Sequence, residues 1–388
     1  VAREIFATSH TSLMVRRSTP QRSSAFMVAS RIASLMPWSA TVTGETLRRF
    51  LSHCKPSFLR AKLPSLGWQP EGMALVPTID ATAPSSADLR AVDVACRDHG
   101  FFLLANHGLD ELLDRAWRET ERFFDAPRNV RTAVMRDRDN PLGYFDRELT
   151  KRKRDHKEVF DFVDPSFPQV DARNRWPRDL PGFRETMTEL YDSLSTLADR
   201  TLSLILDALE LRGASRGAIT CSRRGSMLRL NHYPVGDPVP SDERDGLAEL
   251  GPTALGYHTD PGVLTLLTQD DVGGLQTESL EHGWIDVPPQ RGTIVVNLGD
   301  CTQAYTNDRY RAAVHRVVPM TRRRRFSIPY FSNPPREATV SPIADLCVDG
   351  VRYRPFAWRE FMDARAYDNF ADLGVEDTQV TDYRILNA

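Results

Sequence analysis

Cysteine is scarce in this 388-residue sequence, and the few cysteines follow no recognisable spacing. The five are far apart and include no Cys-x-x-Cys pair, which excludes a disulfide scaffold and a cysteine-ligated zinc site. This usage favours a reducing compartment. The cysteines are Cys54, Cys96, Cys221, Cys301 and Cys347.

Long apolar runs are missing as well. No stretch approaches the roughly 18 apolar residues of a transmembrane helix, so we expect no membrane association. Hydrophobic residues make up 41% of the chain and charged residues 26%, as in soluble globular proteins. The length predicts one large domain or two closely associated ones.

Acidic residues are almost absent from the first 70 residues. This segment has ten Lys or Arg, eleven Ser and two acids, Glu4 and Glu45, so its net charge is +8 and that of the remainder is −10. The composition of residues 1–72 is typical of an organelle transit peptide, and the alternative is a disordered arm. We therefore expect a cytoplasmic protein, or an organellar one if this segment targets it. The acidic remainder argues against a nucleic-acid partner.

Helical signals dominate residues 73–215. A capping box at Ser85–Asp88 predicts a helix that ends near Gly100, and a second helix is expected over 110–124. Between them, residues 101–105 form a buried apolar run typical of a strand. Apolar residues that recur every three or four positions over 183–211 predict one long amphipathic helix.

Short strands separated by turn residues dominate residues 216–335, and their spacing is typical of a sandwich or jelly roll. A C-terminal segment over 336–388 contains a last helix near 358–370. The chain is therefore predicted to be of mixed α and β class. The expected strands lie near residues 227–230, 263–268, 274–277, 284–287, 293–298, 314–318 and 325–331.

Two His-x-acid pairs are candidate metal sites, although such a short motif is a weak signal. On a strand, residues i and i+2 share a face, so either pair could offer an imidazole and a carboxylate to one cation. His156 and Glu158 lie among four neighbouring basic residues that would repel a metal. His258 and Asp260 open directly into a buried apolar run, so this pair is favoured.

His315 is the one downstream histidine inside an expected strand, and it is the candidate third ligand. Two histidines and one carboxylate leave coordination positions open, an arrangement that suits non-haem Fe(II). The alternative is that His258 and His315 are ordinary hydrogen-bonded histidines.

Four further polar residues alternate on two expected strands. Arg325 and Ser327 share one face, and Asn231 and Tyr233 share another. Such a set can bind a carboxylate by a two-pronged guanidinium contact and hydroxyl donors.

Six motifs in this order resemble the iron and 2-oxoglutarate dependent dioxygenases of the isopenicillin N synthase-like group. The resemblance covers roughly residues 75–385. The motifs are Asn231-His-Tyr-Pro234, His258-Thr-Asp260, Gly273-Gly-Leu-Gln276, Asn297-Leu-Gly-Asp300, His315-Arg-Val317 and Arg325-Phe-Ser327.

The resemblance implies a double-stranded β-helix (jelly-roll) core flanked by helices. It implies Fe(II) bound by His258, Asp260 and His315, with dioxygen as oxidant and ascorbate as a further candidate cofactor. It also implies 2-oxoglutarate held by Arg325, Ser327, Tyr233 and Asn231. The run of four arginines that ends at Arg325 leaves Arg323 as an alternative anchor, and His232 departs from the tyrosine that is common in the family.

We therefore expect a monomeric dioxygenase that hydroxylates or desaturates a small organic substrate, as in secondary metabolism, and converts 2-oxoglutarate to succinate and CO2. One alternative is an oxidase of the same fold in which Arg325 and Ser327 bind a substrate carboxylate. A non-catalytic jelly-roll binding protein is disfavoured, because structural metal sites are usually closed.

The remaining features have mostly structural interpretations. Phe123 and Phe124 are expected in the core, and Phe160 and Phe162 either pack there or line a substrate pocket. The basic run 151–157 is interpreted as a solvated face, with a clamp for an acidic substrate as the alternative.

Overall fold

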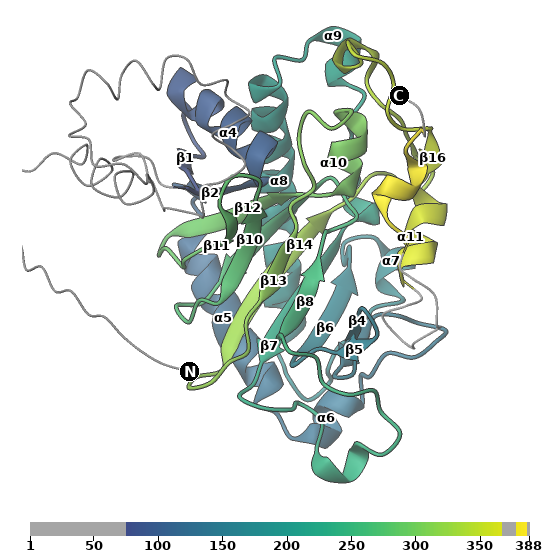
Figure 1. Ribbon diagram of the computed structural model, residues 1–388. Helices are drawn as coiled ribbons and strands as arrows, with labels where there is room; N and C mark the ends of the chain where they lie inside the picture. The colour runs from purple at the N-terminus through teal and green to yellow at the C-terminus, as the bar shows by residue number, and fades with distance from the viewer. Residues whose placement is uncertain (1–74, 367–377, 386–388) are drawn as a thin grey trace, which may run out of the picture. The chain divides into compact units, whose positions relative to one another are not determined.

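The computed structural model describes residues 75–366 and 378–385 of the chain (Figure 1). Two β-sheets form the centre of this part, and helices cover one of them. The expectations for residues 1–72, and for the end of the last helix beyond Ala366, lie outside the described residues.

The larger sheet has eight strands in the order β1-β2-β12-β9-β14-β7-β6-β3. All neighbours pair antiparallel except β1 and β2, which are parallel. Because four of its strands precede residue 216 and four follow it, the sheet spans the boundary that the sequence suggested. The strands are β1 (Thr78–Asp80), β2 (Phe101–Ala105), β3 (Gly143–Phe145), β6 (Glu158–Val163), β7 (Met227–Tyr233), β9 (Leu264–Gln269), β12 (Thr293–Leu298) and β14 (Arg325–Ser332).

The smaller sheet has four antiparallel strands in the order β11-β10-β13-β8. Apolar side chains from both sheets, such as Leu267 and Val295 of the larger and Leu275 and Val317 of the smaller, form one buried cluster between them. The predicted jelly-roll core is thus confirmed. The strands are β8 (Leu255–His258), β10 (Leu275–Ser279), β11 (Gly283–Asp286) and β13 (His315–Val317).

Three long helices pack on the outer face of the larger sheet: α4 (Ser86–Asp98), α5 (Asp110–Phe124) and α8 (Phe183–Ala208). The predicted capping box is present, because Ser85 accepts a hydrogen bond from the backbone N–H of Asp88 and the Asp88 carboxylate accepts one from that of Ser85. The cap satisfies N–H groups that the first turn leaves free.

Helix α8 ends at Ala208, three residues before the predicted end. Glu210 takes up φ 60, in the left-handed region, and this breaks the helix. Leu211 remains buried beyond the break. The apolar stripe therefore continues past the helix, which is why periodicity alone extended the helix too far.

Shorter elements connect these layers. The predicted last helix begins at Trp358 as expected. The remaining helices are α6 (Arg128–Thr132), α7 (Pro168–Asp171), α9 (Gly213–Arg216), α10 (Asp300–Tyr305) and α11 (Trp358–Ala366), with 3-10 turns at Arg223–Gly225, Ser241–Glu243, Ala344–Leu346 and Val380–Tyr383. The remaining strands form two hairpin-like pairs, β4 (Leu149–Thr150) with β5 (Lys153–Arg154) and β15 (Thr339–Val340) with β16 (Phe356–Ala357).

Aromatic side chains fill the space between the larger sheet and its helices. Phe160 and Phe162 are fully buried, and both rings contact Trp176. Phe123 of α5 packs on Phe160 with ring centroids 4.8 Å apart. The packing interpretation of Phe160 and Phe162 is therefore confirmed.

Two further observations concern the helices and the cysteines of the described part of the chain. None of its helices has the length and apolar character needed to cross a bilayer. Its four cysteines, Cys96, Cys221, Cys301 and Cys347, are all unpaired thiols.

Truncation of a side chain in α8 tests the helix packing. Leu194 is fully buried in the main apolar cluster, so Leu194→Ala should lower the free energy of unfolding by about 2–5 kcal/mol. Thr196→Ala, on the exposed side of the same helix, is the control and should change it little. Thermal unfolding followed by circular dichroism measures both, and equal melting temperatures for the two variants would contradict the packing described.

Candidate metal and 2-oxoglutarate site

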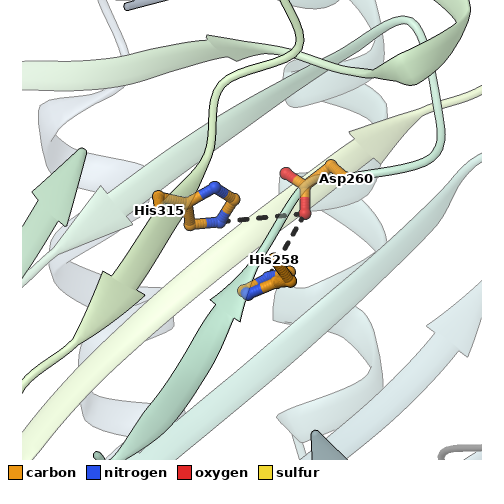
Figure 2. Close-up of side chains that lie close together, drawn as sticks. All are labelled: His258, Asp260 and His315. Carbon is orange, nitrogen blue, oxygen red and sulfur yellow. Dashed lines mark ion pairs between the residues drawn. The ribbon is translucent and has the colours of Figure 1, made fainter. Parts of the chain in front are cut away.

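The His258/Asp260 pair and the distant His315 meet at one end of the small sheet (Figure 2). Their ligand atoms all lie within 4.8 Å of one another, and they are the only such group of potential ligands in the described residues. His258 is the last residue of β8, and His315, the first of β13, lies opposite it in register. Asp260 lies beyond the end of β8, so the expectation that it shares a strand face with His258 is wrong.

Backbone carbonyls orient both imidazoles. The Nδ1 atom of His258 lies 2.8 Å from the Gly256 carbonyl oxygen, and that of His315 lies 2.9 Å from the Ala313 carbonyl oxygen. A carbonyl oxygen only accepts, so each Nδ1 must carry the proton and each Nε2 presents a lone pair. The two Nε2 atoms lie 3.7 and 3.9 Å from Oδ1 of Asp260. Metal-binding histidines are commonly fixed in this way.

The carboxylate of Asp260 is held through its other oxygen. Oδ2 accepts a hydrogen bond of 2.5 Å from the Thr265 hydroxyl and one of 2.8 Å from the Asn297 amide. Oδ1 is therefore left to face the two imidazoles. Asn297 belongs to one of the quoted motifs, whereas Thr265 carried no signal in the sequence.

The protonation states of His258 and Asp260 suit the binding of a metal cation. Burial, with the neighbouring His315 as a second cause, lowers the pKa of His258 to about 3. Burial acts to raise the pKa of Asp260, but attraction to His315 and His258, together with its two hydrogen bonds, brings that pKa below its ordinary value. At neutral pH His258 is neutral and Asp260 is ionised. Lone pairs from nitrogen and a charged oxygen are the donors that Fe(II) takes in such sites, so the residues fit the metal.

The predicted carboxylate-binding residues lie on two paired strands of the larger sheet. Arg325 of β14 is opposite Tyr233 of β7, and Ser327 is opposite Asn231. All four side chains are buried. The Asn231 amide donates to the Ser327 hydroxyl over 3.2 Å, and the Arg325 guanidinium lies over the Tyr233 ring, 4.9 Å from its centroid.

Arg325 is a buried cation with spare donors. Its Nη2 donates to Gln269 over 3.2 Å, while Nε and Nη1 have no partner among the described residues. A buried unpaired donor is costly, so this arrangement indicates an anionic ligand. Arg323 is excluded as the anchor, because its side chain is 60% exposed and pairs with Asp271.

One pocket joins the two sets of residues. Its lining includes all three candidate metal ligands together with Asn231, Tyr233, Arg325 and Ser327. Two further cations line it, Lys157 and Arg229, and sequence reasoning missed both in this role. The period of two along β7, counted back from Tyr233 and Asn231, reaches Arg229 and could have found it.

The rejected pair lies elsewhere. His156 Nε2 contacts the carbonyl oxygen of Gly251, and the Glu158 carboxylate is hydrogen-bonded to Nδ1 of His232 at 2.7 Å. His232, the departure from the family motif, stacks on Phe326 with ring centroids 4.7 Å apart and is not part of the pocket.

The basic run 151–157 is only partly a solvated face, so that expectation is wrong for two of its members. Arg154 and Lys157 are buried. Arg154 pairs with Asp237, and Lys157 pairs with Glu148 and Asp155. The partner of Arg154 is 83 residues away in sequence, and no pattern in the sequence showed that the local acids Glu148 and Asp155 would be buried with Lys157.

Comparison with known sequence families gives two matches. The family described as "2OG-Fe(II) oxygenase superfamily" matches residues 224–334, which include all seven candidate site residues. The family described as "non-haem dioxygenase in morphine synthesis N-terminal" matches residues 76–179.

Individual relatives agree. The chain is 30% identical over 309 residues to gibberellin 2-beta-dioxygenase 1 of Arabidopsis thaliana, an alignment that covers 78% of this chain and 91% of that protein. It is 31% identical over 307 residues to gibberellin 3-beta-dioxygenase 1 of Pisum sativum, covering 76% and 78%.

Solved structures with the same fold contain the expected ligands. JOX2 in complex with 2OG, Fe and JA matches with a TM-score of 0.67 and 26% identity, covering 80% of this chain and 89% of that one. A full-length Neurospora crassa protein in complex with alpha-KG and 5-formyluracil matches with a TM-score of 0.63 and 26% identity, covering 75% and 95%. On its sequence, its fold and the chemistry of its pocket, the chain belongs to the 2-oxoglutarate- and Fe(II)-dependent oxygenase superfamily.

Proposed function

We propose that His258, Asp260 and His315 hold the catalytic Fe(II) of this dioxygenase, and that Arg325 anchors the distal carboxylate of 2-oxoglutarate. The observation that carries the proposal is a single pocket in which three oriented ligand atoms lie near a buried guanidinium with two unpaired donors. Ser327, Tyr233 and Asn231 complete the carboxylate site as neighbouring polar groups on the same two strands.

Fe(II) bound here supplies the activation of dioxygen that converts 2-oxoglutarate to succinate and CO2 and oxidises the substrate. The protein's own residues position and shield the reactants. Three protein ligands leave coordination positions for 2-oxoglutarate and dioxygen. Leu255, Leu275 and Val317 of the small sheet form an apolar wall of the pocket, which limits access of water.

The chain hydroxylates or desaturates a small organic molecule. Its relatives include gibberellin dioxygenases, and its structural neighbours include complexes that hold JA or 5-formyluracil. We propose that the substrate of this chain is a metabolite of similar size. The proposal includes two further points: the enzyme works as a monomer, and it has no nucleic-acid partner. The acidic net charge of residues 71–388 supports the absence of a nucleic-acid partner.

Removal of any one metal ligand should abolish turnover. His258→Ala, Asp260→Ala and His315→Ala should each weaken Fe(II) binding without unfolding the chain, because two ligands cannot hold the ion. Iron content after anaerobic reconstitution and succinate formation from 2-oxoglutarate are the measurements.

His156→Ala is the matched control for these three variants. It removes a half-buried histidine that also bonds to a backbone carbonyl but lies outside the site. It should keep its iron. Near wild-type turnover in a ligand variant, or iron loss in the control, would overturn the assignment.

Arg325→Lys should raise the Michaelis constant for 2-oxoglutarate at least about tenfold, because lysine keeps the charge but loses the two-pronged contact. Ser327→Ala should act in the same direction but more weakly. Arg323→Lys, on an exposed arginine two residues away, is the control.

Oxygen uptake at fixed Fe(II), with 2-oxoglutarate titrated from zero, measures all three constants. Iron content should stay unchanged, since none of these residues is a ligand. A rate that does not depend on 2-oxoglutarate would favour the oxidase in which Arg325 and Ser327 bind a substrate carboxylate.

We also propose that residues 1–72 direct the enzyme to an organelle and take no part in catalysis. Their composition supports targeting, and all seven candidate metal and 2-oxoglutarate ligands lie after residue 230. A fluorescent protein fused to residues 1–72 should enter an organelle of a eukaryotic cell, and the chain without them should keep its turnover of 2-oxoglutarate. A diffuse signal would favour a cytoplasmic enzyme, and lost turnover would show that the segment supports the catalytic body.

A further inference from the structure

A second cavity, of about 500 Å³, adjoins the metal site. His258 lines both cavities, and its side chain is 25% exposed. Most of the second cavity is formed by the other face of the small sheet, because Tyr257 precedes His258, and Arg316 follows His315, on strands whose side chains alternate. Its volume lies within the range of about 300–1,000 Å³ that small-molecule sites occupy. We call it the outer groove.

Cations predominate in the outer groove. Lys151, Arg316 and Arg365 line it, against a single carboxylate, that of Glu278, among its described lining residues. Arg365 lies 3.7 Å from the buried carboxylate of Asp300. Lys151 and Arg316 form no ion pair within the described part of the chain. Among the described residues, therefore, no carboxylate neutralises the positive charge at these two positions of the groove.

Two aromatic rings accompany these cations. The Lys151 ammonium lies 3.5 Å from the centroid of the Tyr257 ring. The Arg316 guanidinium lies 4.0 Å from that of Trp284 and also donates to the Gln276 amide oxygen. The Tyr257 side chain is 49% exposed, so its ring is accessible from the groove. Cation and ring together offer a charged group beside a flat apolar surface.

The turn that carries Lys151 is strained. It joins β4 to β5 through two residues, Lys151 at φ 50 and Arg152 at φ 66. A two-residue hairpin loop with two positive φ angles normally has Asn or Gly there, because other side chains disfavour this conformation. Strain of this kind persists only where the surroundings impose it, and it clusters at ligand sites.

Contacts around the turn at Lys151 and Arg152 hold it in this conformation. The hairpin is docked on β8, where Gly256 leaves room for Thr150; a Cβ at Gly256 would lie 2.5 Å from the Thr150 methyl group. Asp155 ties the two together by accepting hydrogen bonds from the Thr150 hydroxyl and from the Gly256 N–H. Lys151 is thus held at the edge of the groove.

From this geometry we infer that the outer groove binds the prime substrate, and that this substrate is an organic anion with a flat apolar body. Its carboxylate lies between Lys151 and Arg316, since Arg365 is already bonded to protein oxygens, and its body lies against Tyr257 and Trp284. The groove then orients the molecule toward His258 and the metal. The inference rests on the proposed function, since it names the substrate class of that enzyme.

The test compares carboxylic acids with their own methyl esters. The probes are indole-3-acetic acid, 1-naphthaleneacetic acid and gibberellic acid, each beside its ester, in equilibrium dialysis against the full chain with Fe(II) and 2-oxoglutarate under argon. We expect at least one acid to bind about tenfold more tightly than its ester, as charge-assisted hydrogen bonds imply. Lys151→Gln and Arg316→Gln should each weaken binding of that acid about three- to tenfold and leave binding of the ester unchanged.

Lys153→Gln is the matched control. Lys153 lies on the same hairpin, is exposed, and pairs with Glu249 away from the groove, so this variant should bind the acid like the wild type. Equal binding of acid and ester for all three pairs would overturn the inference, as would a preference for the acid that survives in the double variant Lys151→Gln/Arg316→Gln.

Succinate formation by the wild type without any prime substrate is measured separately. Its absence would count against the proposed function. Its presence, with no preference for any acid, would count against the groove alone.

Discussion

The buried carboxylate of Asp260, set between two imidazoles, is the interaction on which the site depends. Burial works against its charge, and the hydrogen bonds that its Oδ2 accepts from Thr265 and Asn297 help to preserve it. Those bonds also decide which oxygen faces the imidazoles. A carboxylate that could rotate freely would present either oxygen, and the set of ligand atoms would not be fixed before the metal arrives.

The alternation of side chains along the strands distributes function over two faces of the same sheet. In β13 the inward His315 is a candidate ligand, while the next residue, Arg316, faces the outer groove. In β8 the same holds for His258 and Tyr257. Metal site and outer groove therefore share strands, so the register that brings the two histidines together also sets the position of the groove residues relative to the metal.

Much of this arrangement could be predicted from sequence, because it depends on period and motif. Alternation along two strands identified Arg325, Ser327, Asn231 and Tyr233, and context separated His258 from His156. What the sequence could not predict depends on long-range pairing. For example, the choice between Arg323 and Arg325 as the residue that faces the pocket requires the burial of the two side chains, which only the structure gives.

The partners of Lys157 explain a second failure of the sequence interpretation. They include Glu148, which also binds Arg229 from 81 residues away. The end of β8 before Asp260 is likewise a tertiary effect, since the chain turns there to place the carboxylate against Thr265 and Asn297.

The charged residues in the pocket that holds the metal ligands and Arg325 explain why an anion should bind at one end of it. Arg229 is already paired with two carboxylates, because it donates to both oxygens of Glu148 and both oxygens of Asp161. Lys157 is paired with Glu148 and Asp155. An anion that approached either cation would meet these carboxylates as well.

Arg325 has no carboxylate partner in the described residues, and two of its donors are unpaired. A dicarboxylate that enters the pocket therefore gains most by directing its far end to Arg325, since only there does binding satisfy buried donors that are otherwise unpaired. Its other end is then free to approach the metal ligands. The orientation of 2-oxoglutarate in the pocket therefore follows from the cations that line it. Lys157 and Arg229 already have carboxylate partners in the protein, and Arg325 has none among the described residues.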